Sequence, residues 1–307
     1  MKHINNTIII GVDHGFGNIK YSSGSFRSGL MEYDEEPLIK NNLLIYENKY
    51  YLIGTGHKEF TADKMSDQDY YILTLAAIAS ELKTANITNA RVHIAAGLPL
   101  TWVVSQRKEF KAYLMQKDTV DFIYNGIKYH IEIVGADVFP QGFAAVADKM
   151  SMFHGTNMLC DIGNGTMSVM YIKNKVPDTG KCFTDKFGTE QCVMRIREAV
   201  FREHHIAIDD NTIDNVIIYG RASISQDLLK TMTDTAKEYV KEIFRKLREY
   251  EYSPLSMRLF IVGGGGCLIK NFGEYDKSLV DINTDICATV KGYEYLSEIY
   301  MRMGDNT

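Results

Sequence analysis

The sequence lacks the features that mark several classes of protein. Its five cysteines are odd in number, scattered, and form no C-x-x-C pair, so we expect neither a disulfide framework nor a structural zinc site. The first ten residues, MKHINNTIII, hold one lysine and a short apolar run, which is too short for a signal peptide or a membrane span. Proline is scarce, with five residues, and no low-complexity linker is present. These absences predict a packed protein of a reducing cytoplasm, without attachment to a membrane.

Two common nucleotide-binding patterns are also missing. The sequence has no P-loop pattern G-x-x-x-x-G-K-[ST] and no complete G-x-G-x-x-G. The formal net charge of −5 gives no general attraction to nucleic acid, so any DNA partner would be reached through an adaptor protein or a local patch. With 307 residues, of which 45% are hydrophobic, the chain is long enough for about two domains.

Strands and helices are expected in a mixed order that occurs twice. The first half opens with a strand at Thr7 to Asp13, a glycine-rich turn and a second strand near Asn18 to Ser22. The pattern restarts at Asn157 with a strand at Met158 to Asp161, another glycine turn and a strand at Thr166 to Ile172. Other strands are expected at 25–27, 92–96, 176–182 and 259–262, hairpins at 43–53 and 122–134, and helices at 67–83, 105–116, 141–152, 190–201, 225–250 and 285–302.

This repetition predicts two related α/β domains with a cleft between them. Domain I would span residues 1–155 and domain II residues 156–284. The order of the elements suggests that the closing helix, within 285–307, returns to domain I. Asp67 is a plausible N-cap of the first long helix, and Gln141 begins the small-residue helix.

The first glycine turn carries a candidate phosphate loop. It reads Gly11-Val12-Asp13-His14-Gly15-Phe16-Gly17-Asn18-Ile19-Lys20. Glycine backbone can approach a phosphate closely and donate N–H groups to it. The carboxylate of Asp13 could hold water on Mg²⁺, and Lys20 could reach a phosphate as a point charge.

The second glycine turn repeats this arrangement. It reads Asp161-Ile162-Gly163-Asn164-Gly165-Thr166 and also follows a buried strand. Either turn alone could be an ordinary hairpin. Two such turns at matching places favour a pair of loops that grip the β- and γ-phosphates of one nucleotide.

Two further motifs extend this site. A buried strand runs into Gly263-Gly264-Gly265-Gly266, whose bare backbone could lie against an adenine ring or an α-phosphate; a flexible loop is the simpler alternative. Gln141 cannot act as a base near neutral pH but could orient an attacking water. Arg197 and Glu198 are candidates for ribose contact, although a solvated helix face explains them more simply.

Taken in this order, the motifs resemble those of the actin-like ATPases, in particular the plasmid-segregation actins of the ParM/StbA type. The turn at Gly11 to Lys20 looks like their first phosphate loop, Asp161 to Thr166 like the second, and Val262 to Gly265 like the adenosine motif. Pro140-Gln141-Gly142 is similar to the start of their first connecting helix. The resemblance implies an actin-like, ribonuclease H-like duplicated fold with a nucleotide cleft between its two domains.

The resemblance also implies an activity and partners. ATP and Mg²⁺ would be the cofactors, with Asp13 and Asp161 holding the metal through water and Gln141 positioning the hydrolytic water. The expected nucleotide-binding residues are Gly15, Phe16, Gly17, Asn18, Lys20, Gly163, Asn164, Gly165, Thr166, Gly263, Gly264 and Gly265. Hydrolysis would destabilise filaments of the protein itself, and filament growth would move plasmid copies through a DNA-bound adaptor protein.

Other functions of the same fold superfamily stay open at this stage. A sugar or carboxylate kinase would need a base to take the proton of the substrate hydroxyl, and no extra acid stands beside the two loops. A cell-shape actin would usually need a membrane-binding segment, and a chaperone a peptide-binding module. Some members carry Glu where this sequence has Gln141, so water orientation and base catalysis remain alternatives.

Overall fold

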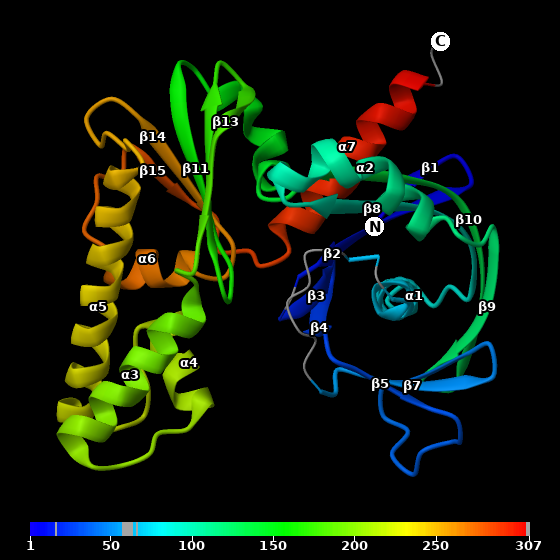
Figure 1. The fold of residues 1–307 in the computed structure, drawn as a ribbon, viewed down its shortest axis with the longest axis horizontal. Helices are drawn as coiled ribbons and strands as arrows, with labels where there is room; N and C mark the ends of the chain where they lie inside the picture. Colours follow the sequence, from blue (N-terminus) through cyan, green and yellow to red (C-terminus); the bar gives the residue numbers. More distant parts are fainter. Residues whose placement is uncertain (16, 57–63, 66, 305–307) are drawn as a thin grey trace. The chain divides into compact units, whose positions relative to one another are not determined.

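The computed structural model describes residues 1–15, 17–56, 64–65 and 67–304. Its contacts divide the chain into two units, one of residues 1–148 with 287–307 and one of residues 149–286 (Figure 1). The C-terminal helix therefore belongs to the first unit. The predicted boundary after residue 155 lies a few residues beyond the contact boundary, and the predicted domain limits stay a prediction.

A ten-stranded sheet forms the frame of the first unit, in the order β4-β3-β2-β8-β10-β9-β6-β7-β5 with β1 paired to β2. The strands are β1 (Lys2–Ile4), β2 (Thr7–His14), β3 (Asn18–Tyr21), β4 (Gly24–Arg27), β5 (Leu30–Tyr33), β6 (Leu43–Tyr46), β7 (Lys49–Ile53), β8 (Asn89–Leu98), β9 (Thr119–Tyr124) and β10 (Ile127–Pro140). Strand β8 pairs in parallel with both β2 and β10, so the carboxyl ends of these three strands meet at one edge.

Helix α1 (Asp69–Lys83) lies inside the curve of this sheet (Figure 1). Every residue from Tyr70 to Ala79 is buried, which is the pattern of a helix covered all round. The hairpin turns are formed by Glu47-Asn48 and by Asn125-Gly126, all with positive φ. Two such residues give the type of turn whose twist matches that of the strands, so both predicted hairpins are confirmed.

Helices α2 (Leu100–Leu114) and α7 (Ala288–Gly304) complete the first unit together with η1, a 3-10 helix (Phe143–Met152) that runs past the unit boundary. Helix α7 lies very close to its neighbours, because a Cβ on Gly292 would be 1.9 Å from the carbonyl oxygen of Ala144. A Cβ on Gly11 would be 2.6 Å from Val290 Cγ1. Glycine and alanine at these contacts allow this close approach of main chains.

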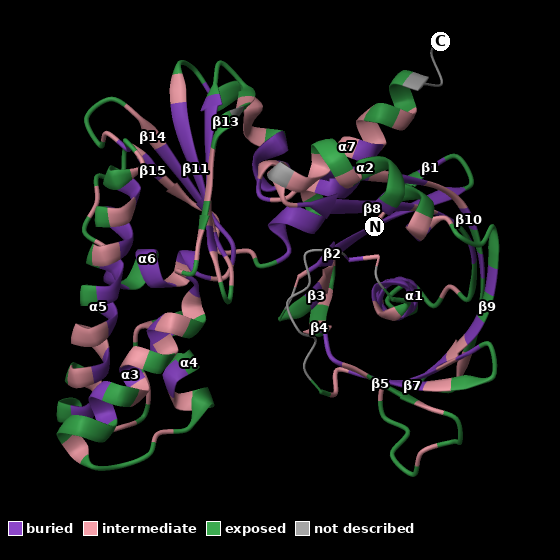
Figure 2. Ribbon diagram, in the orientation of Figure 1, coloured by how far each residue is buried: buried purple, intermediate pink, exposed green. Residues whose placement is uncertain are grey.

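The second unit contains a five-stranded sheet in the order β13-β12-β11-β14-β15. Its elements are β11 (Thr156–Ile162), β12 (Met167–Lys173), β13 (Val176–Asp185), β14 (Arg258–Val262), β15 (Val280–Ile282), α3 (Thr189–His204), α4 (Asp210–Tyr219), α5 (Gln226–Glu249) and α6 (Gly266–Phe272). Helix α5 buries one stripe and exposes the opposite face (Figure 2), as its sequence pattern predicts. The exposed face carries charges of both signs. Asp161 at the end of β11 stands opposite Val262 at the end of β14.

Three predictions about helix starts are wrong. Helix α2 begins at Leu100, directly after its N-cap Pro99 and five residues before the predicted start at residue 105. Strand β10 runs on to Pro140, so Gln141 lies in a turn before η1 and not in a helix, and Gly142 takes a φ of 72° there. Helix α1 begins at Asp69 with Gln68 at its N-cap, while Asp67 Oδ1 accepts from the N–H of Asp69. At Gln141, the pairing of β10 with β8 as far as Pro140 decided where the following helix starts.

Elements that the sequence pattern did not predict are mostly short. They are β1, β5, β15, α4 and α6, and four of these five have seven residues or fewer. So few residues give no measurable period. Among the helices of the described residues, none is both long and apolar enough to cross a membrane.

Candidate functional site

The first glycine turn joins β2 to β3, with Asp13 opposite Lys20 in the antiparallel register. Gly15 fits this turn because a Cβ there would be 2.5 Å from the carbonyl oxygen of Asn18. The buried Ser28 closes the turn: its hydroxyl donates to the Gly15 carbonyl oxygen at 2.6 Å, and its N–H donates to that of Gly17 at 3.1 Å. The turn is therefore held by a residue outside the predicted motif. Phe16, which was predicted to bind nucleotide, lies outside the described residues.

Two of the predicted site residues contact the carboxylate of Asp13. Gln141 Nε2 donates to Asp13 Oδ1 at 2.8 Å, and Lys20 Nζ lies 3.5 Å from Asp13 Oδ2. The Asp13 side chain is buried, with the residue 6% exposed. Gln141 reaches it because β2, β8 and β10 end at the same edge, where the Gln141 N–H donates to the Leu98 carbonyl oxygen at 2.8 Å. The structure thus brings together a carboxylate, an amide and an ammonium group that are far apart in the sequence.

A buried lysine supports the same loop from a place that sequence reasoning missed. Lys64 is 1% exposed, and its Nζ donates to the carbonyl oxygen of His14 at 2.6 Å. Burial lowers the pKa of Lys64 to about 8, while the negative charge of Asp13 opposes this shift. Lys64 does not belong to a recognisable sequence motif. Its role in supporting the loop is visible only from its burial beside the loop in the folded chain.

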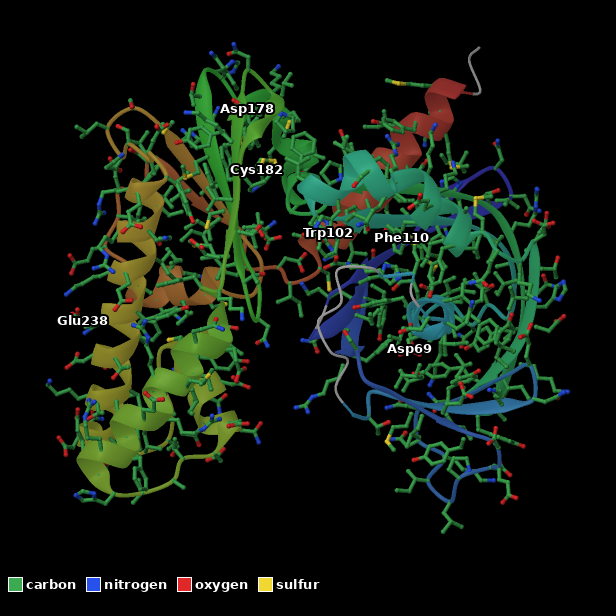
Figure 3. All side chains as sticks on the ribbon, in the orientation of Figure 1. Asp69, Trp102, Phe110, Asp178, Cys182 and Glu238 are labelled. Atoms are coloured by element: carbon green, nitrogen blue, oxygen red, sulfur yellow. The ribbon has the colours of Figure 1, made fainter. Side chains whose placement is uncertain are left out.

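His14 completes this buried polar cluster. Its ring lies edge-on to Tyr70 and to Phe110, which lies on α2 (Figure 3). The Thr74 hydroxyl donates to the Tyr70 carbonyl oxygen at 2.6 Å and lies 2.7 Å from His14 Nε2, so Nε2 is assigned as the donor to Thr74. Burial, followed by the charge of Lys64, lowers the pKa of His14 to about 3. The ring is therefore neutral.

The second glycine turn joins β11 to β12 and is held almost wholly by main chain. Gly163 N–H donates to the Thr166 carbonyl oxygen at 2.8 Å. The N–H groups of Thr189 and Glu190, in the first turn of α3, donate to the carbonyl oxygens of Gly163 and Asn164 at 3.0 and 2.9 Å. Two donors that a helix start leaves unused are thereby satisfied, and the turn is fixed to α3.

Glycines allow this close contact between the turn and α3. A Cβ on Gly188, the N-cap of α3, would be 2.2 Å from the Asn164 carbonyl oxygen. Tyr239 on α5 then donates its hydroxyl to the Gly188 carbonyl oxygen at 2.7 Å. The second turn, α3 and α5 therefore form one connected group within the second unit.

The run of four glycines after β14 lies directly against the second turn. Gly265 N–H donates to the Ile162 carbonyl oxygen at 2.9 Å. Gly263 has a φ of 86°, and a Cβ there would be 2.5 Å from Asp161 Oδ1. A Cβ on Gly264 would meet nothing closer than 3.9 Å. Asp161 and this run of glycines, predicted to share a site, are thus brought together in the second unit.

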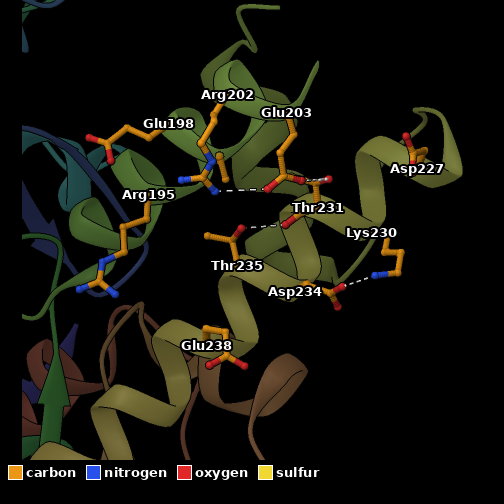
Figure 4. Close-up of a pocket in the computed structure, with 11 residues that line it drawn as sticks. Arg195, Glu198, Arg202, Glu203, Asp227, Lys230, Thr231, Asp234, Thr235 and Glu238 are labelled. Carbon is orange, nitrogen blue, oxygen red and sulfur yellow. Dashed lines mark hydrogen bonds and ion pairs between the residues drawn. The ribbon is translucent and has the colours of Figure 1, made fainter. Parts of the chain in front are cut away.

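A groove in the second unit lies at a different place from the two turns. It has a volume of about 630 Å³ and lies between α3 and α5, where Arg202 pairs with Glu203 and Lys230 with Asp234 (Figure 4). Of the predicted residues, Glu198 lines it. Arg197 bonds to Asp210 instead. Among the described residues, no group of three or more His, Cys, Asp or Glu side chains could hold a metal ion by itself.

Comparisons with known proteins agree with this architecture. Residues 11–143 match the family model described as the actin like proteins N terminal domain. A search of curated protein sequences gave no match. Solved structures are similar at low sequence identity, so they show the fold alone.

Three of these structures cover almost the whole chain. The apo pSK41 ParM protein has a TM-score of 0.75 and 16% identity, covering 97% of this chain and 99% of its own. The Alp12 filament structure has a TM-score of 0.73 and 14% identity, covering 97% and 100%. Bacillus thuringiensis ParM with ATP has a TM-score of 0.70 and 13% identity, covering 97% and 100%. The chain has the two-domain actin-like fold, and its residues 11–143 match the model of the actin-like protein N-terminal domain.

Proposed function

We propose that this chain binds ATP with Mg²⁺ through its two glycine turns, hydrolyses it, and assembles into dynamic filaments. The observation that carries the proposal is the contact of Gln141 and Lys20 with the buried Asp13 carboxylate, near the end of β2 and beside a glycine turn. Asp161 repeats this position in the second unit, beside Gly163 and Gly263. The solved structure of Bacillus thuringiensis ParM with ATP supports the choice of nucleotide.

The carboxylate oxygens of the two turns fit a magnesium ion that is bound through water. Mg²⁺ prefers oxygen ligands, keeps several waters and uses one or two carboxylates together with phosphate oxygens. Asp13 and Asp161 supply such carboxylates, and Asp13 already accepts from Gln141, which favours a contact through water over direct ligation. When bound, the metal would neutralise charge on the phosphates.

The chain's own residues would then position the reactants. The N–H groups at Gly17 and Gly165 would donate to phosphate oxygens, because those of Gly15 and Gly163 already donate to carbonyl oxygens within the turns. Lys20 would exchange its contact with Asp13 for one with phosphate. The side chain of Gln141 would orient the attacking water, because an amide cannot take a proton near neutral pH. The glycine run at 263–265 would take the adenosine.

The filament role concerns plasmid DNA segregation. It rests on the motif resemblance and on the likeness to the pSK41 and Bacillus thuringiensis ParM proteins and to the Alp12 filament. The net charge of −5 makes a DNA-bound adaptor protein the expected link to DNA. The cytoplasmic location stays a prediction.

Light scattering together with phosphate release tests the proposal. ATP with Mg²⁺ should raise the scattering above a critical protein concentration, and the signal should decay as phosphate is released. Chelation of Mg²⁺ should abolish both signals. A chain that gave no rise, and consumed ATP only when a sugar or carboxylate substrate was added, would be a kinase.

Variants of the site separate hydrolysis from binding. Gln141→Ala should lower the rate of phosphate release about 100-fold while nucleotide affinity stays within about threefold, since the residue acts on the water. Gln116→Ala, at an exposed glutamine after α2, is the matched control and should leave both unchanged. Normal hydrolysis by Gln141→Ala would remove Gln141 from the mechanism.

A further inference from the structure

The loop between β5 and β6 exposes two neighbouring apolar side chains. Leu38 is fully exposed and Ile39 is 67% exposed. Single exposed apolar residues are common on protein surfaces, but two adjacent ones at the tip of a loop leave a compact apolar projection in water.

The same loop carries negative charge that is not paired. Asp34, Glu35 and Glu36 precede the apolar pair and are exposed. Glu36 pairs with Lys40 at 2.8 Å. Within the described part of the chain, neither Asp34 nor Glu35 forms an ion pair. The loop therefore offers an apolar tip with an acidic flank, which we call the acidic loop (residues 34–39).

Helix α2 offers a surface of the opposite character. Its inner side packs into the core through Phe110 and Leu114, both fully buried. Its outer side holds Val104, 80% exposed, followed by the exposed cations Arg107, Lys108 and Lys111. Arg107 and Lys108 come three and four positions after Val104, and Lys111 comes four and three positions after them, so the four residues form one stripe, which we call the basic stripe.

In the described part of the chain, the cations of the basic stripe are not paired with acidic side chains, although the charge of Lys111 helps to lower the pKa of Asp137. In the ranges that the structure describes, Arg107, Lys108 and Lys111 form no ion pair, whereas most charged residues on the outer face of α5 are paired. The aliphatic stems of these side chains, together with Val104, also present apolar surface. The stripe is thus complementary to the acidic loop, because its charge is opposite and both surfaces include apolar groups.

The two surfaces lie at opposite ends of the first unit (Figure 1). The β5–β6 loop projects below β5 in this view, and α2 lies at the top of the unit, beyond the sheet. The acidic loop of one copy cannot reach its own basic stripe, but it can reach the stripe of another copy. A contact between two different surfaces at opposite ends adds copies head to tail without closing into a dimer.

We propose that the acidic loop of one copy docks on the basic stripe of a second copy of this chain. Leu38 and Ile39 lie on Val104 and on the stems of the cations, while Asp34 and Glu35 pair with Arg107 and Lys108. The inference rests on the proposed filament function and names a contact within the filament. Such a small patch forms one part of a larger interface, since specific interfaces bury about 1,600 Å² in total.

Charge reversal tests the contact in the full-length chain. The loop variant carries Asp34→Lys with Glu35→Lys, and the helix variant carries Arg107→Glu with Lys108→Glu. Each should raise the critical concentration for ATP- and Mg²⁺-dependent pelleting more than about tenfold, because like charges then meet at the contact. Nucleotide binding and thermal unfolding should stay close to those of the original chain.

A 1:1 mixture of the two variants gives the decisive measurement. The basic loop of one variant matches the acidic helix of the other, and the remaining acidic loop matches the remaining basic helix. The mixture should therefore pellet at a critical concentration within about threefold of the original chain, although neither variant does so alone. Misfolding of either variant would not be rescued by mixing.

Matched controls and the opposing outcomes complete the design. Lys83→Glu with Lys128→Glu reverses two exposed cations elsewhere in the first unit and should leave pelleting unchanged. Leu255→Asp, at a residue 92% exposed in the second unit, is the control for Leu38→Asp, which should block pelleting. If the original chain pellets and both charge-reversal variants pellet equally well, this contact is wrong and the filament proposal stands. If the original chain does not assemble with ATP and Mg²⁺, both proposals are overturned.

Discussion

The two glycine turns have nearly the same sequence pattern but are supported in different ways. Side chains from distant parts of the chain hold the first turn: Ser28 binds the Gly15 carbonyl oxygen, Lys64 that of His14, and Gln141 the Asp13 carboxylate. The second turn is held by main-chain bonds from α3 and from the glycine run after β14. The comparison shows that equivalent motifs need not depend on equivalent residues.

This difference has a consequence for substitution. The first turn should be sensitive to the chemistry of its supporting side chains, whereas the second should be sensitive to any added Cβ. The following four predictions test the contrast, from the largest expected effect to the smallest.

Gly263→Ala should give the largest loss of stability. The new Cβ would lie 2.5 Å from Asp161 Oδ1 and 2.6 Å from the Ile162 carbonyl oxygen, at a φ of 86° that alanine rarely adopts. We expect the free energy of unfolding in urea to fall by about 4 kcal/mol. Gly264→Ala, whose Cβ meets nothing closer than 3.9 Å, should change it by less than about 1 kcal/mol. Equal effects of the two would contradict the close packing of this loop.

Acid should destabilise the chain through His14. The pKa of His14 in the folded chain is about 3, below the ordinary value of 6.5, so the unfolded chain binds a proton that the folded chain does not bind. Stability is therefore lost as the pH falls from about 6.5 towards 3, by about 3 kcal/mol at pH 4.

Comparison with His14→Gln isolates this contribution. Urea unfolding of both chains between pH 7 and pH 4, without nucleotide, should show a steeper loss for the original chain. His3→Gln, at an exposed histidine of the same unit, is the control and should keep the steep loss. Parallel curves for the original chain and His14→Gln would show that His14 takes up a proton while folded.

Lys64→Met should separate stability from nucleotide binding. Methionine has a similar shape and removes a buried charge, so the free energy of unfolding should stay the same or rise slightly. The carbonyl oxygen of His14 loses its donor, and the first turn loses a positive charge beside Asp13. ATP affinity, measured by calorimetry, should fall about tenfold.

The conservative variant supplies the control for Lys64. Lys64→Arg keeps the charge and a donor, and should retain more of the affinity than Lys64→Met. If both variants bound ATP as tightly as the original chain, the side-chain support of the first turn would have no part in binding.

The smallest losses of stability are expected from two substitutions that each remove one side-chain hydroxyl, one beside each turn. Ser28→Ala removes a buried bond of 2.6 Å to the Gly15 carbonyl oxygen and should lower the free energy of unfolding by about 1.5 kcal/mol. Thr189→Ala removes an exposed bond of 3.2 Å to Asn164 Oδ1 but leaves the main-chain bonds of the second turn. Its loss should stay below about 0.5 kcal/mol. Equal losses in thermal melts would remove the contrast between the two turns.

Local chemistry made much of the fold predictable. Asn125-Gly126 predicts its hairpin because both residues tolerate positive φ, and the buried stripe of α5 follows from residues at helical spacing. The confirmed fold class rests on such local signals in the right order. The helix start at Gln141 was wrong, because the pairing of β10 with β8 as far as Pro140 is a long-range effect.

The candidate site likewise contains residues that the sequence predicts and residues that it does not. The acid and glycine residues of each turn are visible in the sequence, since a tight turn after a buried strand needs them. Lys64 carries no such signal, because its burial and its bond to His14 arise only when the chain has folded around α1. Gly188 also carries no local signal. Glycine is required there because a Cβ would clash with the carbonyl oxygen of Asn164, which lies 24 positions earlier in the sequence.

The sequence by itself therefore determined the two acid–glycine turns, the strands that lead into them and the actin-like order of the elements. Only the tertiary structure decided which residues hold each turn, and that Gln141 and Lys20 meet on one carboxylate. The physical reason is range: turn and strand preferences act between neighbours along the chain, whereas burial and hydrogen bonding join residues that the fold alone brings together.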